Sequence, residues 1–245
     1  MQKNECVLVI GATRGTGYLI AKRLLEEGYR VRALARKGVQ ARELFGGQAE
    51  VVVGDVTKPE TLVPAVAGAD HIVFTAGVTR RLAPEAQVKA VVHDGVLNTL
   101  AAAKAAGFTG RFLLMGAIGT TRGSLLSFLL NLIKGKTLRW RRRAEEAVRR
   151  SGFDYTIIHA GILTNSPGGA AVEIGQRHLP MRPWYRISRA DAAEVFVQAL
   201  KHPATRNTTF DAIGSRDDRM RGWDARFRNL HPDEGHLELS APHEA

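Results

Sequence analysis

VLVIGATRGTGYLIAKRLLEEGYRVRALAR, residues 7–36, is the stretch that decides the fold. It begins with an apolar run, passes through three closely spaced glycines, and continues with apolar residues at helical spacing before a second β-rich run. A glycine-rich turn between a strand and an amphipathic helix is typical of a phosphate-binding loop, because free N–H groups at the helix start face the anion. The stretch therefore predicts a βαβ unit that binds a phosphorylated ligand.

The three glycines of this loop have different expected roles. Gly11 allows the tight turn, Gly15 lets the backbone approach a diphosphate, and Gly17 allows close packing of helix and strand. Their spacing is G-x-x-x-G-x-G and differs from the G-x-G-x-x-G pattern. A tight turn without a ligand is the alternative. The residues that we expect to contact the ligand here are Gly11, Thr13, Arg14, Gly15, Thr16 and Gly17.

The rest of the chain repeats the alternation of strand and helix. Further β-rich runs lie at 50–54, 71–76, 111–116, 154–160 and 208–213, and most are separated by segments with apolar residues at helical spacing. Such alternation implies a parallel sheet with helices on both faces. We therefore expect an α/β fold, a single-domain Rossmann-like doubly wound sheet over residues 1–214, followed by a polar tail or flap at 215–245.

Composition limits the classes of function. The chain has 245 residues, 44% of them hydrophobic, and a formal net charge of +11, which favours anionic partners. A single cysteine, Cys6, excludes a disulfide within the chain. The histidines are scattered, so no metal site is expected. The sequence has no signal-peptide pattern and no apolar run of membrane-spanning length, which predicts a cytoplasmic protein.

Four motifs resemble the short-chain dehydrogenase/reductase superfamily. They are GATRGTG at 11–17, GDVT at 54–57, FTAG at 74–77 and AEEAVRRSGFDYTII at 144–158. The segment 140–161 is more similar to the atypical branch, which comprises NmrA-like and biliverdin reductase B-like NAD(P)H-binding proteins. The resemblance extends from about residue 6 to residue 214 and implies the fold expected above.

The resemblance also implies contacts with the adenosine half of a dinucleotide. Asp55 and Val56 match the acidic–apolar pair that contacts adenine, and Ala76 and Gly77 match small residues that leave room for the ribose. A helix N-cap is the alternative role for Asp55, because aspartate is a favoured cap.

Charge at the end of the second strand favours NADP(H) over NAD(H). Sites that select NAD have an acidic residue there, whereas a 2′-phosphate requires arginine. Arg36 and Lys37 occupy this position, and Arg14 in the loop is placed to reach the same phosphate. The alternative is that Arg36 and Lys37 only form a solvated strand end.

The catalytic residues of tyrosine-dependent members are absent. Gly116 and Ala117 stand where those members have serine, and the resemblance places Thr137 at the tyrosine position and Arg141 at the lysine position. Arginine can bind the nicotinamide ribose but cannot relay protons near neutral pH. We therefore expect hydride transfer to a small planar or apolar acceptor, such as a flavin, a quinone-like ring or a conjugated carbonyl, with water supplying the proton.

His159 is a second candidate catalytic residue besides Arg141. It stands at the end of the sixth strand, where the resembled branch usually has the arginine of an Arg-Pro-Gly-like turn. Ligands of open α/β sheets bind beyond the carboxyl ends of the strands, and the usual pKa of histidine permits proton donation. The alternative is a structural histidine held by hydrogen bonds. We expect Tyr155 to serve packing.

Residues 124–133 form an apolar segment of open function. The sequence SLLSFLLNLI is apolar almost all round a short helix. It would be a buried core helix, line an apolar pocket, contact a partner subunit or rest on a membrane surface. Basic residues nearby that could anchor it to a membrane are Lys134, Lys136, Arg139, Arg141, Arg142 and Arg143.

Three functions remain open. The first is an NADPH-dependent oxidoreductase acting on a small molecule. The second is a non-catalytic NADP(H)-sensing module that regulates a partner, which the missing serine and tyrosine allow. The third is a nucleic-acid binder, suggested by RWRRR at 139–143. No nucleic-acid motif accompanies these arginines, so we expect no nucleic-acid partner.

Overall fold

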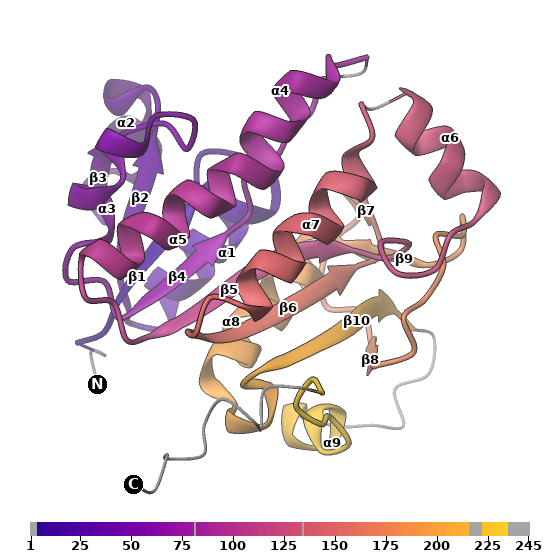
Figure 1. Cartoon of the computed structure of the whole chain (residues 1–245). Coiled ribbons are helices and arrows are strands. Elements are labelled where there is room, and N and C mark those ends of the chain that lie inside the picture. Colours follow the sequence, from indigo (N-terminus) through magenta and orange to yellow (C-terminus); the bar gives the residue numbers. More distant parts are fainter. Residues whose placement is uncertain (1–3, 81, 134, 216–221, 235–245) are drawn as a thin grey trace, which may run out of the picture.

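The computed structural model describes residues 4–80, 82–133, 135–215 and 222–234. Its centre is an eight-stranded sheet in the order β3-β2-β1-β4-β5-β6-β10-β8, and only β8 is antiparallel to its neighbour among these described strands (Figure 1). A separate parallel pair joins β7 and β9. The strands are β1 (Cys6–Ile10), β2 (Arg30–Ala35), β3 (Glu50–Val53), β4 (His71–Phe74), β5 (Arg111–Ala117), β6 (Asp154–Ala160), β7 (Ile162–Thr164), β8 (Val172–Gly175), β9 (Arg186–Ser188) and β10 (Thr208–Gly214).

Helices cover both faces of the sheet. On one face α1 packs with α8, and on the other lie α3, α5 and α7 (Figure 1). The helices are α1 (Gly15–Glu26), α2 (Gly38–Phe45), α3 (Val63–Val66), α4 (Glu85–Lys89), the π-helix η2 (Ala90–Asp94), α5 (Gly95–Ala105), α6 (Leu125–Ile133), α7 (Thr137–Arg149), α8 (Arg189–Lys201) and α9 (Trp223–Phe227), with 3₁₀ turns η1 (Pro59–Thr61) and η3 (Pro203–Thr205).

The central strands are apolar because both of their faces are covered. All residues of β1 are buried, and the strand supplies Val7 and Val9 to one core cluster and Leu8 and Ile10 to the other. Strand β1 pairs with β2 on one side and β4 on the other, so the strand order reverses there. This is the point at which doubly wound sheets bind their ligands. The predicted α/β fold is confirmed.

Helix α8 begins with Ser188 as its N-cap. The hydroxyl of Ser188 accepts a hydrogen bond from the backbone N–H of Asp191, at 2.9 Å, and donates one to the Asp191 carboxylate, at 2.7 Å. The other carboxylate oxygen accepts from the N–H of Gly169. Asp191 therefore ties the helix start to the 165–171 loop.

Residues 222–234 fall in the segment predicted to be a polar tail or flap, but they pack against the core. Phe227 is fully buried and Leu230 nearly so, in the cluster that includes α1 and α8. The few apolar residues in this strongly charged stretch produce no detectable period, which is why this packing was not predicted. Residues 216–221 and 235–245 of the predicted tail lie outside the described part of the chain.

The apolar segment 124–133 forms helix α6, but its interpretation as a buried core helix is wrong. Ser127 is its buried residue, whereas Leu125, Phe128 and Leu132 are among the most exposed large apolar side chains described. Lys134, a candidate anchor, lies outside the described residues. Over the described ranges, no helix combines the length and apolarity needed to cross a bilayer.

Candidate cofactor site and adjoining ion cluster

The glycine loop joins the carboxyl end of β1 to the start of α1. Gly11 has φ +92°, and a Cβ atom there would lie 2.8 Å from the Thr75 hydroxyl and 2.9 Å from the Ala76 nitrogen. A Cβ at Gly17 would collide with the Gly11 carbonyl oxygen. Both glycines therefore let the loop pack against the end of β4. Gly15 has φ +56° and is exposed, so its backbone is open to a ligand.

The start of α1 has unpaired hydrogen-bond donors that fit a diphosphate. No side chain caps this helix, and its first turn contains no acidic residue. The hydroxyl of Thr16 is buried without a hydrogen-bond partner among the described residues. Thr13 and Arg14 are exposed beside it. Free N–H groups, a helix N-terminus and a nearby guanidinium together favour an anion, so the residues present fit the predicted ligand.

Arg189 adds a second guanidinium to this loop, which the sequence reading missed. It is the first residue of α8, and its Nε lies 3.8 Å from where a Cβ of Gly15 would be. Its Nη1 donates to the Asn165 side-chain oxygen at 2.7 Å. Nothing in the local sequence signals this approach, because it depends on α8 packing against α1.

The residues predicted to bind adenosine follow strands at the same edge of the sheet. Arg36 and Lys37 follow β2 and are exposed, while Ala76 and Gly77 follow β4 and are partly buried. Since β2 and β4 flank β1, the fold brings both pairs to the edge that carries the glycine loop.

Asp55 and Val56 follow β3 at that edge, but their side chains are engaged locally. One carboxylate oxygen of Asp55 accepts hydrogen bonds from the N–H and the hydroxyl of Thr57, both at 2.9 Å. Val56 is buried, and its carbonyl oxygen accepts from Asn98 at 2.9 Å. These bonds close a turn and do not cap a helix, because η1 begins after Lys58 and has no side-chain cap. The N-cap alternative for Asp55 is therefore wrong, while its contact with adenine stays a prediction.

Arg141 projects from α7 to the carboxyl ends of β4 and β5. Its Nη1 donates to the Met115 carbonyl oxygen at 2.7 Å, and its Nη2 lies 3.2 Å from where a Cβ of Gly77 would be. Burial lowers the pKa of the guanidinium, and the Glu145 carboxylate acts in the opposite direction. Arg141 also lines a recess of about 10 Å³, with room for roughly one water molecule, together with Ala76, Gly116 and Glu145.

The surroundings of Gly116, near the end of β5, leave no room for the serine that tyrosine-dependent members have there. A Cβ atom there would lie 2.6 Å from the ring of His159 and 2.8 Å from Oε1 of Glu145. A serine would therefore require both buried side chains to move. The absence of the serine and the presence of His159 are two parts of one packing arrangement.

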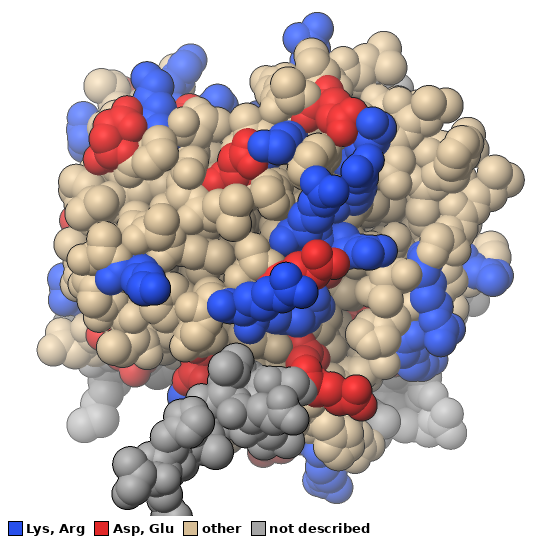
Figure 2. Space-filling model, viewed as in Figure 1, with Lys and Arg blue, Asp and Glu red and all other residues tan. Residues whose placement is uncertain are grey.

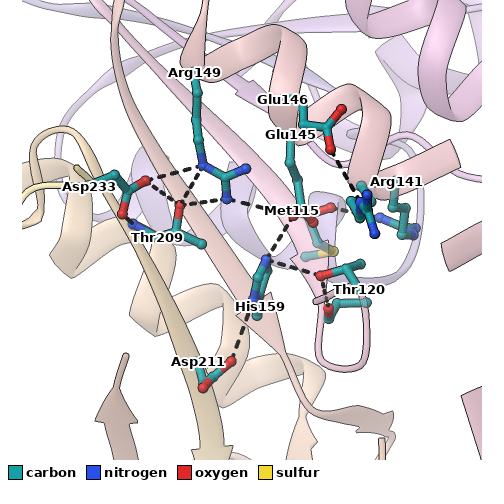
Figure 3. A network of polar contacts seen from close by, with 12 residues as sticks. Met115, Thr120, Arg141, Glu145, Glu146, Arg149, His159, Thr209, Asp211 and Asp233 are labelled. Carbon is teal, nitrogen blue, oxygen red and sulfur yellow. Dashed lines mark hydrogen bonds and ion pairs between the residues drawn. The ribbon is translucent and has the colours of Figure 1, made fainter. Parts of the chain in front are cut away.

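His159 lies at the centre of a buried ion cluster and is only 1% exposed (Figure 3). Its Nε2 lies 3.0 Å from Glu145 Oε2, and its Nδ1 lies 3.5 Å from Asp211 Oδ1. Burial has the largest single effect and lowers the pKa of His159. The two carboxylates together outweigh it and raise the pKa to about 9. His159 is therefore cationic at neutral pH and faces carboxylates, which fits its structural alternative.

The cluster continues to the C-terminal part of the sheet. Arg149 lies 3.8 Å from Glu145 Oε2, donates to the Thr209 hydroxyl at 2.9 Å and pairs with Asp233 at 3.3 Å (Figure 3). The buried Tyr155 donates its hydroxyl to Asp233 at 2.9 Å, so it serves packing as predicted.

Glu145 has one oxygen, Oε1, that is buried without a hydrogen-bond partner in the described structure. The sequence reading missed this residue, although it could have been found, because a side chain four positions after Arg141 lies on the same side of a helix. Asp211 could not have been found, since it faces His159 only through the pairing of β6 with β10.

The arginine run that suggested nucleic-acid binding is divided in the structure. Arg139 and Arg143 stack on Trp140, Arg142 pairs with Glu146 at 3.2 Å, and Arg141 is turned toward Met115. Figure 2 shows basic side chains on this face interrupted by acidic ones. Within the described ranges, no group of three or more His, Cys, Asp or Glu residues could hold a metal ion.

Comparisons with known proteins agree with this site. Residues 11–203 match a family described as NAD(P)H-binding. Sanguinarine reductase from Eschscholzia californica is 30% identical over 251 residues, covering 87% of this chain and 90% of that protein. NAD(P)H azoreductase from Xenophilus azovorans is 27% identical over 215 residues, covering 85% of this chain and 68% of that protein. Some other curated relatives are longer, and the chain spans 65% and 35% of two of them.

A solved structure shares the fold. A wide-type short-chain dehydrogenase/reductase from Veillonella parvula DSM 2008, in complex with NADP, has a TM-score of 0.69 at 14% identity, covering 87% of this chain and 96% of that chain. The family match spans the glycine loop, Arg141 and His159, and the two reductase relatives cover 87% and 85% of the chain. The chain therefore belongs to the NAD(P)H-binding family, as an oxidoreductase of the atypical short-chain dehydrogenase/reductase type.

Proposed function

We propose that this protein is an NADPH-dependent reductase that transfers hydride to a small planar or apolar acceptor without a Ser-Tyr-Lys triad. The observation that carries the proposal is the pair formed by Arg141 and Gly116. Arg141 offers hydrogen-bond donors at the ends of β4 and β5, whereas Gly116 offers no acid. An acceptor that needs little help from a protein acid suits such a site.

Each part of the site has a defined task. When bound, NADPH supplies the hydride. The N–H groups at the start of α1 and the hydroxyl of Thr16 bind the diphosphate. The guanidinium of Arg141 orients the nicotinamide ribose, and water supplies the proton to the product. His159 holds Glu145 in place behind Gly116, so it is a positioning residue.

The preference for NADPH rests on Arg36, Lys37 and Arg14. These side chains offer cations at the end of β2 and in the loop, and guanidinium forks bind phosphate oxygens in pairs. Isothermal titration of Arg36→Ser with NADPH and NADH tests this. We expect NADPH to bind roughly 10-fold to 100-fold more weakly, as for the loss of a charged hydrogen bond, while NADH affinity stays unchanged. Lys104→Ser is the matched control, because Lys104 is an exposed cation in the last turn of α5. Equal losses for both nucleotides would contradict the assignment.

Turnover separates the reductase from an NADP(H)-sensing module. The sensing module is the second candidate function. Gly116 favours it too, because this glycine leaves the site without the serine of tyrosine-dependent members. Oxidation of NADPH is followed in absorbance with flavin and quinone acceptors. Steady oxidation that is lost in Arg141→Met supports the reductase. Tight NADPH binding without oxidation by any acceptor tested would refute the reductase and favour the sensor.

A further inference from the structure

Helix α6 has its apolar face toward the solvent. Leu125, Phe128, Leu129, Leu132 and Ile133 are between 42% and 76% exposed. They follow the spacing i, i+3, i+4, i+7 and i+8, which places them on one side of a helix. This is the side that a helix of a soluble domain normally buries. We refer to these five residues as the α6 apolar stripe.

The orientation of α6 is held by hydrogen bonds on its inner side. The hydroxyl of Ser124, just before the helix, lies 2.8 Å from the Ser127 hydroxyl and donates to the Met181 carbonyl oxygen at 2.9 Å. Near the other end, the Asn131 side-chain oxygen accepts from the N–H of Leu138, the second residue of α7, at 2.9 Å. The polar residues are therefore used inward, and the stripe is the face left for another surface.

The charged residues in the sequence around α6 are all basic, although not all of them are free at the surface. Lys136 pairs with Glu85 at 2.8 Å, Arg142 pairs with Glu146, and Arg141 is turned toward Met115. Residues 117–144 contain seven Lys or Arg residues and no Asp or Glu. Among the described ones, Arg122 precedes the helix, and Arg139 and Arg143 on α7 stack on Trp140. In Figure 2 the upper right of the molecule, where Figure 1 has α6, is largely uncharged, and basic side chains lie beside it. An apolar stripe flanked by cations is complementary to a bilayer surface, which has anionic headgroups on the outside and apolar acyl chains beneath them.

We propose that α6 docks this protein on the surface of an anionic lipid bilayer, with the stripe at the boundary of headgroups and acyl chains and the flanking cations on lipid phosphates. A helix of nine residues is too short to cross a bilayer and is suited to lying in its surface. A second copy of the chain is a poorer occupant, because each copy has a net charge of +11 and brings the same basic border to the contact.

Flotation of the full chain with vesicles tests the proposal. One set consists of phosphatidylcholine, and the other also contains anionic phosphatidylglycerol. We expect flotation with the anionic vesicles, weakened by added salt, because charge contributes to it. Phe128→Ser combined with Leu132→Ser is expected to lower binding by roughly tenfold or more. The matched control combines Val39→Ser and Leu44→Ser, two exposed apolar residues of α2, and is expected to bind as the unchanged protein does.

A site-specific label gives a second readout if the serine variant fails to fold. Cys6 is the single cysteine and is buried, so a thiol-reactive, environment-sensitive fluorophore would label Phe128→Cys selectively. We expect a blue shift with anionic vesicles, and none for Val39→Cys.

Two results would overturn the proposal. The first is equal flotation of the unchanged protein and a folded Phe128→Ser, Leu132→Ser variant, or no flotation at all. The second is a dimer in light scattering that dissociates in the same variant, which would assign the stripe to a second copy.

Discussion

The free energy of unfolding is expected to fall as the pH rises from about 6.5 to about 9, because His159 holds its proton more tightly in the folded chain. Its pKa is raised from 6.5 to about 9 in the folded protein, with Glu145 and Asp211 outweighing burial. A group with a raised folded pKa contributes stability that is complete below its unfolded pKa. That stability is lost as the pH passes through the folded value.

The magnitude follows from the size of the pKa shift. Each pH unit between the two values lowers the unfolding free energy by about 1.4 kcal/mol, and the interval spans two and a half units. We therefore expect a loss of about 3 kcal/mol, which is a large part of the stability of an ordinary domain. The partners that raise this pKa are Glu145 and Asp211, and Arg149 contacts Glu145 on its other side.

Urea unfolding at a series of pH values measures this change. His159→Gln removes the titrating group, so its unfolding free energy is expected to lack this fall of about 3 kcal/mol. Its overall stability is nevertheless expected to drop, because two buried carboxylates lose their partner. His231→Gln, an exposed histidine, is the control and is expected to behave as the unchanged protein does. NMR titration of the His159 ring gives the pKa directly. A ring that loses its proton near pH 6.5 in the folded protein would refute the reasoning.

Three further predictions concern the loop, a helix cap and the C-terminal packing. Gly17→Ala is expected to weaken NADPH binding at least about tenfold in calorimetry, since the methyl group collides with a carbonyl of the same loop, whereas Gly123→Ala, with open space around it, is expected to leave binding unchanged. Ser188→Ala is expected to lower the urea unfolding free energy by about 0.5–2 kcal/mol through the lost cap, and no change would show that the cap is dispensable. Phe227→Ala is expected to cost about 3–5 kcal/mol in the same assay, against nearly nothing for the exposed Arg228→Ala; equal small effects would contradict the packing of α9.

The fold was predictable because its central strands are buried on both faces. Runs such as CVLVI in β1 and the helical spacing that follows the glycine loop are strong local signals, and all seven predicted strands are present. The short strands β7, β8 and β9 were not predicted. Each has only three or four residues, which is too short for an alternation of apolar and polar side chains to be recognised in the sequence.

The site was predictable only where one local segment carries the contact. The glycine loop and Arg141 lie at the carboxyl edge of the sheet, while their contacts with a dinucleotide stay predictions. The environment of His159 was not predictable, since Asp211 reaches it through strand pairing and Glu145 through the packing of α7 on the sheet. The pKa of a histidine depends on such neighbours, so a sequence alone leaves its charge open.

The link between Arg149 and Asp233 has a consequence for the order in which this protein is made. Asp233 follows Arg149 by 84 residues, and Phe227 fills a cluster built largely from earlier helices. During synthesis on the ribosome, α7 and β6 emerge long before Asp233, which pairs with Arg149, and before Phe227, which completes the apolar cluster. The sheet can begin to assemble during synthesis, but its ion cluster is completed only after residue 233 is free, so a nascent chain stalled earlier would expose an unfinished core to chaperones and proteases.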